Sequence, residues 1–243
     1  MIFKKLILAS ALMLPTALHA QRSWGGSIDL GYVDATGKTC ASRCSRSRTF
    51  SLAENIKWNT SPRFKILQQL RSIYGEARDS VIARSFNLNV DGDYRMFDHV
   101  GLTAGVGYDK NKFAGIKTRT EESVGLSWQG KTQRGDSLRV IAAVLWTQQK
   151  NTLDVQNDFI AAKAGFVLRS PVGKYAYFQQ SVETIPNLET TEDWRLNSES
   201  ALVASFSKRL ALKITYLIRY DHLPEPTFKD TDRLFTAGIQ VTY

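Results

Sequence analysis

Few residues of this sequence have the types and spacing that chemistry requires. The two cysteines, Cys40 and Cys44, lie close together in the segment 34–47, whereas His99 and His222 stand far apart. A nucleophile and its base must lie within hydrogen-bond reach, and no cue in the sequence brings a serine to either histidine. No glycine-rich phosphate loop, zinc-binding helix motif or paired-carboxylate signature is present. We therefore predict no catalytic, cofactor-binding or metal-binding residues, and a protein that is not an enzyme.

Residues 1–20 have the organisation of a secretory leader. Two lysines precede a short apolar run, and Ala20 is a small residue at the predicted cleavage site before Gln21. The apolar run is too short to cross a bilayer as a helix. We expect residues 1–20 to be removed on export and residues 21–243 to form one domain.

Export determines how the cysteines are interpreted. An even pair of cysteines in an exported chain predicts a disulfide, here between Cys40 and Cys44 at the tip of a loop. Two sulfurs alone make a poor metal site, and the nearest histidine of the mature chain, His99, is far away in sequence.

The mature sequence alternates between apolar and polar residues along most of its length. In residues 210–220, leucine, isoleucine and tyrosine hold one parity, and the other parity includes Lys213 and Arg219. A period of two is the pattern of a β-strand, because successive side chains point to opposite faces. Twelve such segments are found, near 23–33, 48–58, 64–74, 83–94, 100–109, 118–128, 137–147, 158–168, 175–185, 194–206, 209–220 and 232–243.

The length of these segments indicates a membrane. Soluble strands typically have about 5–6 residues, whereas a tilted strand needs about 9–11 to cross a bilayer, and most of the segments match the second value. Odd-numbered connections, such as 34–47 and 221–231, tend to be longer than even-numbered ones, such as 59–63, as in outer-membrane barrels. We predict an all-β protein: a transmembrane antiparallel up-and-down β-barrel of about 12 strands, closed by the C-terminal strand. A soluble lipocalin-like or jelly-roll domain is the alternative.

In such a barrel the apolar parity faces lipid, and the other parity lines a wet lumen. Charges of both signs fit a water-filled or ion-paired lumen and are hard to explain in a dry sandwich core. A ring of basic lumen residues would favour anions in a narrow passage. The candidate lumen charges are Arg119, Glu121, Arg139, Lys163, Arg195, Glu199, Lys213 and Arg219, together with Asp29, Lys57, Arg71, Asp91 and Asp93.

Two acidic residues do not fit this division. Glu54 and Glu122 share the apolar parity, where a carboxylate facing lipid is destabilising. A β-bulge, an interface between protomers or protonation could each remove the conflict.

The first long connection is basic. Lys38, Arg43, Arg46 and Arg48 cluster there, at the predicted outer rim. The net charge of +9 could suit nucleic acid or an acidic membrane surface, but export makes nucleic acid an unexpected partner. The phosphates of lipopolysaccharide are the expected counter-charges, and a merely solvated loop is the alternative.

The C-terminus resembles the assembly signal of bacterial outer-membrane barrels. Gly238, Val241 and the terminal Tyr243 are the matching positions of its last alternating strand. A strand that ends at the terminal residue leaves its edge free to pair with the assembly machinery before the barrel closes.

The spacing of the last fifty residues carries a family resemblance. Residues 199–220, the prolines 224 and 226, and the closing strand after Asp230-Thr231-Asp232 resemble the salt-induced outer-membrane protein family, domain of unknown function 481. The resemblance implies a barrel in the outer membrane of a Gram-negative bacterium, and it implies no catalytic residues.

The expected protein is therefore a monomeric outer-membrane barrel with outer-membrane lipid and lipopolysaccharide around it. It is either structural or a narrow passage for small solutes, with a preference for anions. One alternative is a lipid-modifying enzyme, because some twelve-stranded barrels are lipases with a lipid-facing histidine and serine, which makes His222 the residue to test. The other alternative is a soluble periplasmic binding barrel.

Overall fold

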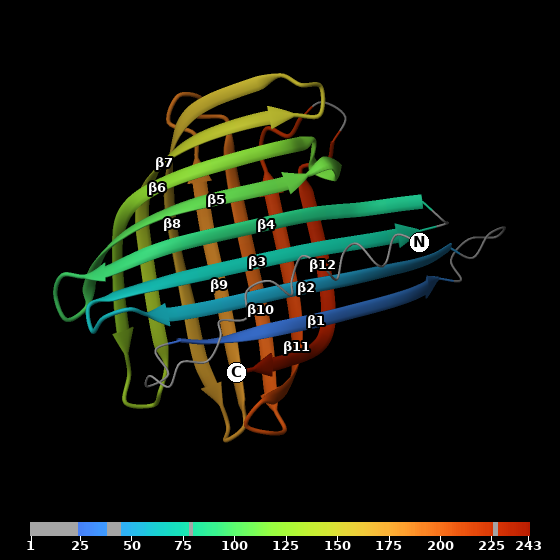
Figure 1. Ribbon diagram of the computed structural model, residues 1–243. Helices are drawn as coiled ribbons and strands as arrows, with labels where there is room; N and C mark the ends of the chain where they lie inside the picture. Colours follow the sequence, from blue (N-terminus) through green and yellow to red (C-terminus); the bar gives the residue numbers. More distant parts are fainter. Residues whose placement is uncertain (1–23, 38–44, 78–79, 226–227) are drawn as a thin grey trace.

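Twelve antiparallel strands form a closed barrel in the computed structural model, which describes residues 24–37, 45–77, 80–225 and 228–243. Each strand pairs with its neighbours in sequence, and β1 pairs with β12 (Figure 1). The predicted fold class is thereby confirmed. The strands are β1 (Trp24–Gly37), β2 (Ser45–Asn59), β3 (Phe64–Ala77), β4 (Ser80–Arg95), β5 (Val100–Asn111), β6 (Ile116–Lys131), β7 (Ser137–Asn151), β8 (Gln156–Val172), β9 (Ala176–Pro186), β10 (Trp194–Ser205), β11 (Leu210–Asp221) and β12 (Thr231–Thr242), with one 3₁₀ turn, η2 (Lys112–Ala114).

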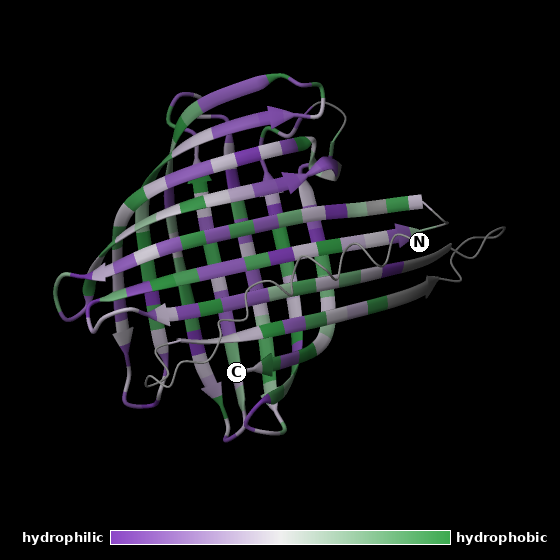
Figure 2. Cartoon of the chain, viewed as in Figure 1, coloured by the Kyte–Doolittle hydropathy of each residue, from purple (hydrophilic) through white to green (hydrophobic). Residues whose placement is uncertain are grey.

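The two faces of each strand differ as the alternating sequence predicts. On β7, Leu145 is fully buried inside the barrel, whereas its neighbours Val144 and Trp146 are 51% and 54% exposed. Figure 2 shows the same alternation of hydrophobic and hydrophilic residues along the strands of the near wall. An apolar outer surface of this extent would be costly in water and is stable against lipid. No helix in the described part of the chain could span a membrane.

The two ends of the barrel carry different connections. We call the end where β1 begins and β12 finishes the turn end; its connections are the short segments 60–63, 96–99, 132–136, 173–175 and 206–209. We call the other the loop end, with connections 38–44, 78–79, 112–115, 152–155, 187–193 and 222–230.

The loop-end connections are shorter than predicted because the strands continue into them. β1 and β2 remain paired as far as Gly37↔Ser45, so residues 34–37 and 45–47 of the expected loop belong to strands. β1–β4 consequently project at the loop end (Figure 1). The sequence pattern missed these extensions because alternation is required only where one face meets lipid.

The barrel closes where β1 meets β12. Their register runs only from Ser27↔Thr242 to Gly31↔Gly238, the shortest pairing of the barrel. A side chain at Gly238 would overlap the carbonyl oxygen of Leu30, so this position requires glycine.

The last residue lies across the seam. The backbone of Tyr243 exchanges hydrogen bonds of 3.1 and 3.2 Å with Gly26, and its ring lies 5.4 Å from that of Trp24. Val241, the third residue of the proposed assembly signal, pairs with Ile28 across the seam and with Leu210 on β11. Gly238 and Val241 thus lie in β12, the strand that closes the barrel, and Tyr243 directly follows it.

Candidate functional site in the lumen

A compact ionic cluster fills one half of the turn end. The carboxylate of Asp93 on β4, whose side chain is only 3% exposed, lies 2.8 Å from the guanidinium of Arg139 and 3.5 Å from the ammonium of Lys65. It also accepts hydrogen bonds from Ser127 at 3.3 Å and Gln129 at 3.2 Å. We call these five residues the Asp93 cluster. Every member contacts Asp93, so its negative charge is well compensated.

A second network fills the other half of the turn end. Asp29 on β1 accepts a hydrogen bond of 2.5 Å from Lys213 and one of 2.7 Å from Gln240. The Tyr177 hydroxyl lies 3.3 Å from the Gln240 amide oxygen, and the guanidinium of Arg169 stacks 3.5 Å above the Tyr177 ring. We call these residues the Asp29 network. The turn end is therefore occupied by side chains that bind one another, with Nε of Arg139 the one buried nitrogen of the Asp93 cluster that has no hydrogen-bond partner among the described residues.

Two ion pairs cross the middle of the barrel. Arg71 on β3 pairs with Glu199 on β10, from the opposite side of the barrel. Arg195, also on β10, donates a hydrogen bond of 2.8 Å to Glu121 on β6. A barrel of twelve strands is intermediate between eight-stranded barrels filled by side chains and sixteen-stranded barrels with an open channel. These pairs, which we call the braces, narrow its lumen further.

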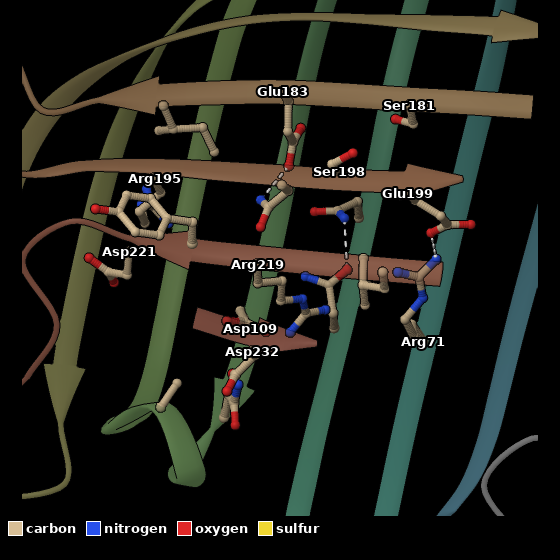
Figure 3. Close-up of a pocket in the computed structure, with 18 of the residues that line it drawn as sticks. Arg71, Asp109, Ser181, Glu183, Arg195, Ser198, Glu199, Arg219, Asp221 and Asp232 are labelled. Atoms are coloured by element: carbon tan, nitrogen blue, oxygen red, sulfur yellow. Dashed lines mark hydrogen bonds and ion pairs between the residues drawn. The ribbon is translucent and has the colours of Figure 1, made fainter. Parts of the chain in front are cut away.

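Above the Asp29 network a cavity of about 310 Å³, which we call the chamber, extends toward the loop end (Figure 3). Its wall is polar and carries as many acidic as basic residues. The basic residues are Arg71, Arg119, Lys163, Arg195, Lys213, Arg219 and Lys229, and the acidic ones are Asp109, Glu121, Glu183, Glu199, Asp221, Asp230 and Asp232. A volume of this size suits a small molecule.

Glu225, in the connection that follows β11, reaches across the barrel to β7. The carboxylate of Glu225 accepts hydrogen bonds from Gln149 at 3.2 Å and Asn151 at 3.0 Å. Its side chain also lies close to Gly115, which follows η2 and has a φ of +79°, so no larger residue would fit there. Glu225 therefore holds part of this connection against the far wall of the loop end.

Most of the predicted lumen charges lie in the Asp93 cluster, the Asp29 network or the wall of the chamber, whereas Lys57 is exposed, and the basic residues form no single ring. Arg139 belongs to the Asp93 cluster at the turn end, and Lys213 pairs with Asp29 at the boundary between the turn end and the chamber. Arg119, Arg195 and Arg219 line the chamber. The ring from which an anion preference was predicted is therefore divided between levels, and most of its members face carboxylates.

Several chamber acids were missed by the sequence interpretation. Asp221 was assigned to the connection 221–231, although it lies in β11, and Asp232, at the start of the last predicted segment, was given no role in the lumen; both line the chamber. Asp109 and Glu183 share the inward parity of their segments, and this parity alone could have identified them.

The structure also places the two acidic residues of the lipid-facing parity. No register shift occurs at Glu54 or Glu122, so a bulge does not reorient either side chain. The hydroxyl of Tyr243 lies 3.4 Å from the Glu54 carboxylate. Glu122 lies opposite Trp146, at the level where an aromatic residue marks the edge of the apolar band.

Several predicted residues lie outside the described part of the chain. These are Cys40, Cys44, Lys38 and Arg43, together with the leader and its cleavage site at Ala20 and Gln21; the side chain of Arg46 is likewise not described. Arg48 is exposed and lies opposite Glu76 on β3.

His99 and His222 make no hydrogen bond to a serine among the described residues. Nδ1 of His99 lies 3.0 Å from the carbonyl oxygen of Gln129. His222 lies 2.8 Å from the Tyr220 hydroxyl and stacks on Trp194 at 5.3 Å. The described residues also contain no group of histidine, cysteine, aspartate and glutamate side chains that could hold a metal ion.

Three solved structures show the same fold at low sequence identity. The translocator domain of autotransporter NalP from Neisseria meningitidis is 12% identical, with 93% of this chain and 89% of that one covered and a TM-score of 0.50. The NanC porin is 11% identical, with 89% and 97% covered and a TM-score of 0.51. An outer membrane channel from Pseudomonas putida F1 is 9% identical, with 93% and 96% covered and a TM-score of 0.52. The fold is thus that of outer-membrane β-barrels.

Sequence comparison gives the family. No curated protein matches the chain. A family model described as "Protein of unknown function, DUF481" matches residues 28–243, from the first strand to the last residue. The chain therefore belongs to the DUF481 family.

Proposed function

We propose that this protein is an outer-membrane barrel that admits small solutes through a narrow, polar lumen. The observation that carries the proposal is the distribution of charge. A barrel with an apolar exterior encloses a cavity of about 310 Å³ whose wall carries fourteen charged residues. Because removing a charge from water is costly, so many charged residues are stable inside the barrel only when water or a polar solute reaches them.

The proposal differs from a wide aqueous pore. The braces cross the lumen, and the Asp93 cluster and the Asp29 network occupy its turn end. Passage therefore requires small solutes and movement of charged side chains. Because acidic and basic residues of the chamber are equal in number, we expect weak selectivity between simple anions and cations rather than the strong anion preference of a basic ring.

Liposome swelling tests the proposal. The full mature protein is reconstituted into liposomes, and swelling is followed in neutral sugars of increasing size, with heat-modifiable electrophoretic mobility as the check on folding. We expect swelling with the smallest solutes and none with disaccharides. A correctly folded barrel that lets none of these solutes pass would leave a purely structural role.

The outer rim supports a second, separate proposal. Arg48 is exposed at the loop end, where the basic residues 38, 43 and 46 are its neighbours in sequence. We expect them to contact the phosphates of lipopolysaccharide. Neutralising all four should weaken lipopolysaccharide binding, and unchanged binding across a salt series would discard this contact.

Thiol labelling of the unfolded, unreduced protein tests the Cys40–Cys44 disulfide, which predicts no free thiol.

A further inference from the structure

We propose that the chamber binds a small zwitterion, a solute with a carboxylate and an ammonium group on one short skeleton. The inference rests on the proposed passage of small solutes and names their chemical class.

The starting observation is that the chamber keeps charges of both signs without partners. Arg219 on β11 and Lys163 on β8 make no ion pair or hydrogen bond with any other described residue. Oδ1 of Asp109 on β5 is buried and has no hydrogen-bond partner among the described residues. The Asp93 cluster, by contrast, surrounds its one carboxylate with two cations and two neutral donors.

These charges face the same space from different walls. Figure 3 shows Arg219 between Glu183 on one side and Asp109 and Asp232 on the other. The carboxylates of Asp109 and Asp232 both act electrostatically on Arg219, although neither forms an ion pair with it. The chamber thus presents a guanidinium without an ion pair and, at Asp109, a carboxylate oxygen without a hydrogen-bond partner, within reach of one small molecule.

The mixed signs exclude simple ions as the best occupants. An enclosed charge without a partner is costly, and a complementary ligand group recovers that cost. A lone anion would pair with Arg219 but would be repelled by Asp109, and a lone cation would meet the reverse problem. A zwitterion can give its carboxylate to Arg219 and its ammonium group to the carboxylates.

The rest of the wall suits such a solute. Amide side chains line the β2–β4 side, namely those of Asn55, Gln69, Asn87 and Asn89. Amides donate and accept hydrogen bonds without adding net charge. They can bind the polar skeleton of a solute while the charged residues of the chamber bind its carboxylate and ammonium groups.

Four solutes of nearly equal size test the inference: alanine (zwitterion), lactate (anion), alaninamide (cation) and lactamide (neutral). Each is added to the mature protein in a planar bilayer, and the reduction of the potassium chloride current is measured. We expect alanine to reduce the current at a concentration at least tenfold lower than the other three solutes require. Arg219→Gln should shift the preference toward alaninamide, and Asp109→Asn should shift it toward lactate. Asp154→Asn, which removes a carboxylate outside the lumen, should leave the preference unchanged.

The outcomes separate this inference from the proposed function. If lactate or lactamide blocks the current as well as alanine does, the zwitterion site is overturned and the proposed passage of solutes still stands. If the folded protein carries no current, passage fails, and calorimetric titration of the same four solutes into the detergent-solubilised barrel decides the binding site. Alanine-specific heat that is lost in Arg219→Gln would support the site, and equal or absent heats would overturn it.

Discussion

The Asp93 cluster and the chamber place similar residues in opposite circumstances. In the cluster, Lys65 and Arg139 share one deeply buried carboxylate, and neutral donors complete its hydrogen bonds. In the chamber, Arg219 and Asp109 line one cavity and remain unpaired. The composition of the two regions is alike, so charge alone does not distinguish structure from function. The pairing of the charges does: paired charges hold the barrel together, and unpaired charges are available to a solute.

The largest effect is expected from removing the centre of the cluster. Asp93→Ala leaves two cations at the turn end without their carboxylate, and breaking a buried ion pair costs about 3–5 kcal/mol. We expect a marked fall in the urea midpoint of the reconstituted barrel and a shift of its reversal potential toward anions. Asp93→Asn keeps an oxygen acceptor and should lose less stability. An unchanged midpoint in Asp93→Ala would show that the cluster does not hold the turn end together.

The braces should affect passage more than stability. Arg71 and Glu199 are partly accessible to water, at 29% and 14%, so breaking their pair should cost only about 1–3 kcal/mol. The double variant Arg71→Ala/Glu199→Ala removes both charges and the obstruction, and we expect a severalfold larger single-channel conductance. Equal conductance in the variant and the wild type would mean that this pair does not narrow the path.

Glu225 should have a smaller effect, confined to the loop end. Glu225→Ala loses two hydrogen bonds to β7, and because these bonds hold a loop-end connection rather than the barrel wall, their loss loosens that end locally without unfolding the barrel. We expect a modest rise in conductance, with stability of the barrel nearly unchanged. Glu225→Gln retains an acceptor and serves as the matched control. A rise of the same size in both variants would rule out these hydrogen bonds as the cause.

The smallest effect is expected outside the lumen. Hydrogen bonds from Lys117 and Lys150 hold the pKa of Asp154 below its usual range. The stabilisation is therefore present at neutral pH and is lost as the pH falls through that lowered pKa. Because the site is exposed, Asp154→Asn should reduce the urea midpoint slightly at neutral pH and not at all in strong acid, with no change in current. A larger difference in acid than at neutral pH would contradict this assignment.

Much of the fold is readable from the sequence because a lipid-facing strand must alternate. The outer face of β7 is marked in the sequence by apolar residues such as Val144 and Trp146, and the other strands show the same pattern. The inward direction of Arg119 and Glu199 then follows from the alternation. Strand ends beyond the membrane escape this rule, as β1 and β2 show by pairing as far as Gly37↔Ser45.

The pattern of pairing inside the lumen is not readable in the same way. Arg71 pairs with Glu199 on a strand of the opposite wall. The alternation shows which side of the strand a residue faces, but not its position along the barrel axis or its partner across the lumen. For the same reason the basic residues were expected to form one ring, although closure of the barrel places Arg139 at the turn end and Arg219 in the chamber.

The most direct test of the water-accessible, ion-braced lumen is the single-channel current of the folded, mature protein in a planar bilayer. We predict small, stepwise currents with weak selectivity between potassium and chloride, and larger steps when Arg71 and Glu199 are both replaced by alanine. A heat-modifiable, correctly folded barrel that stays silent in both forms would contradict the account.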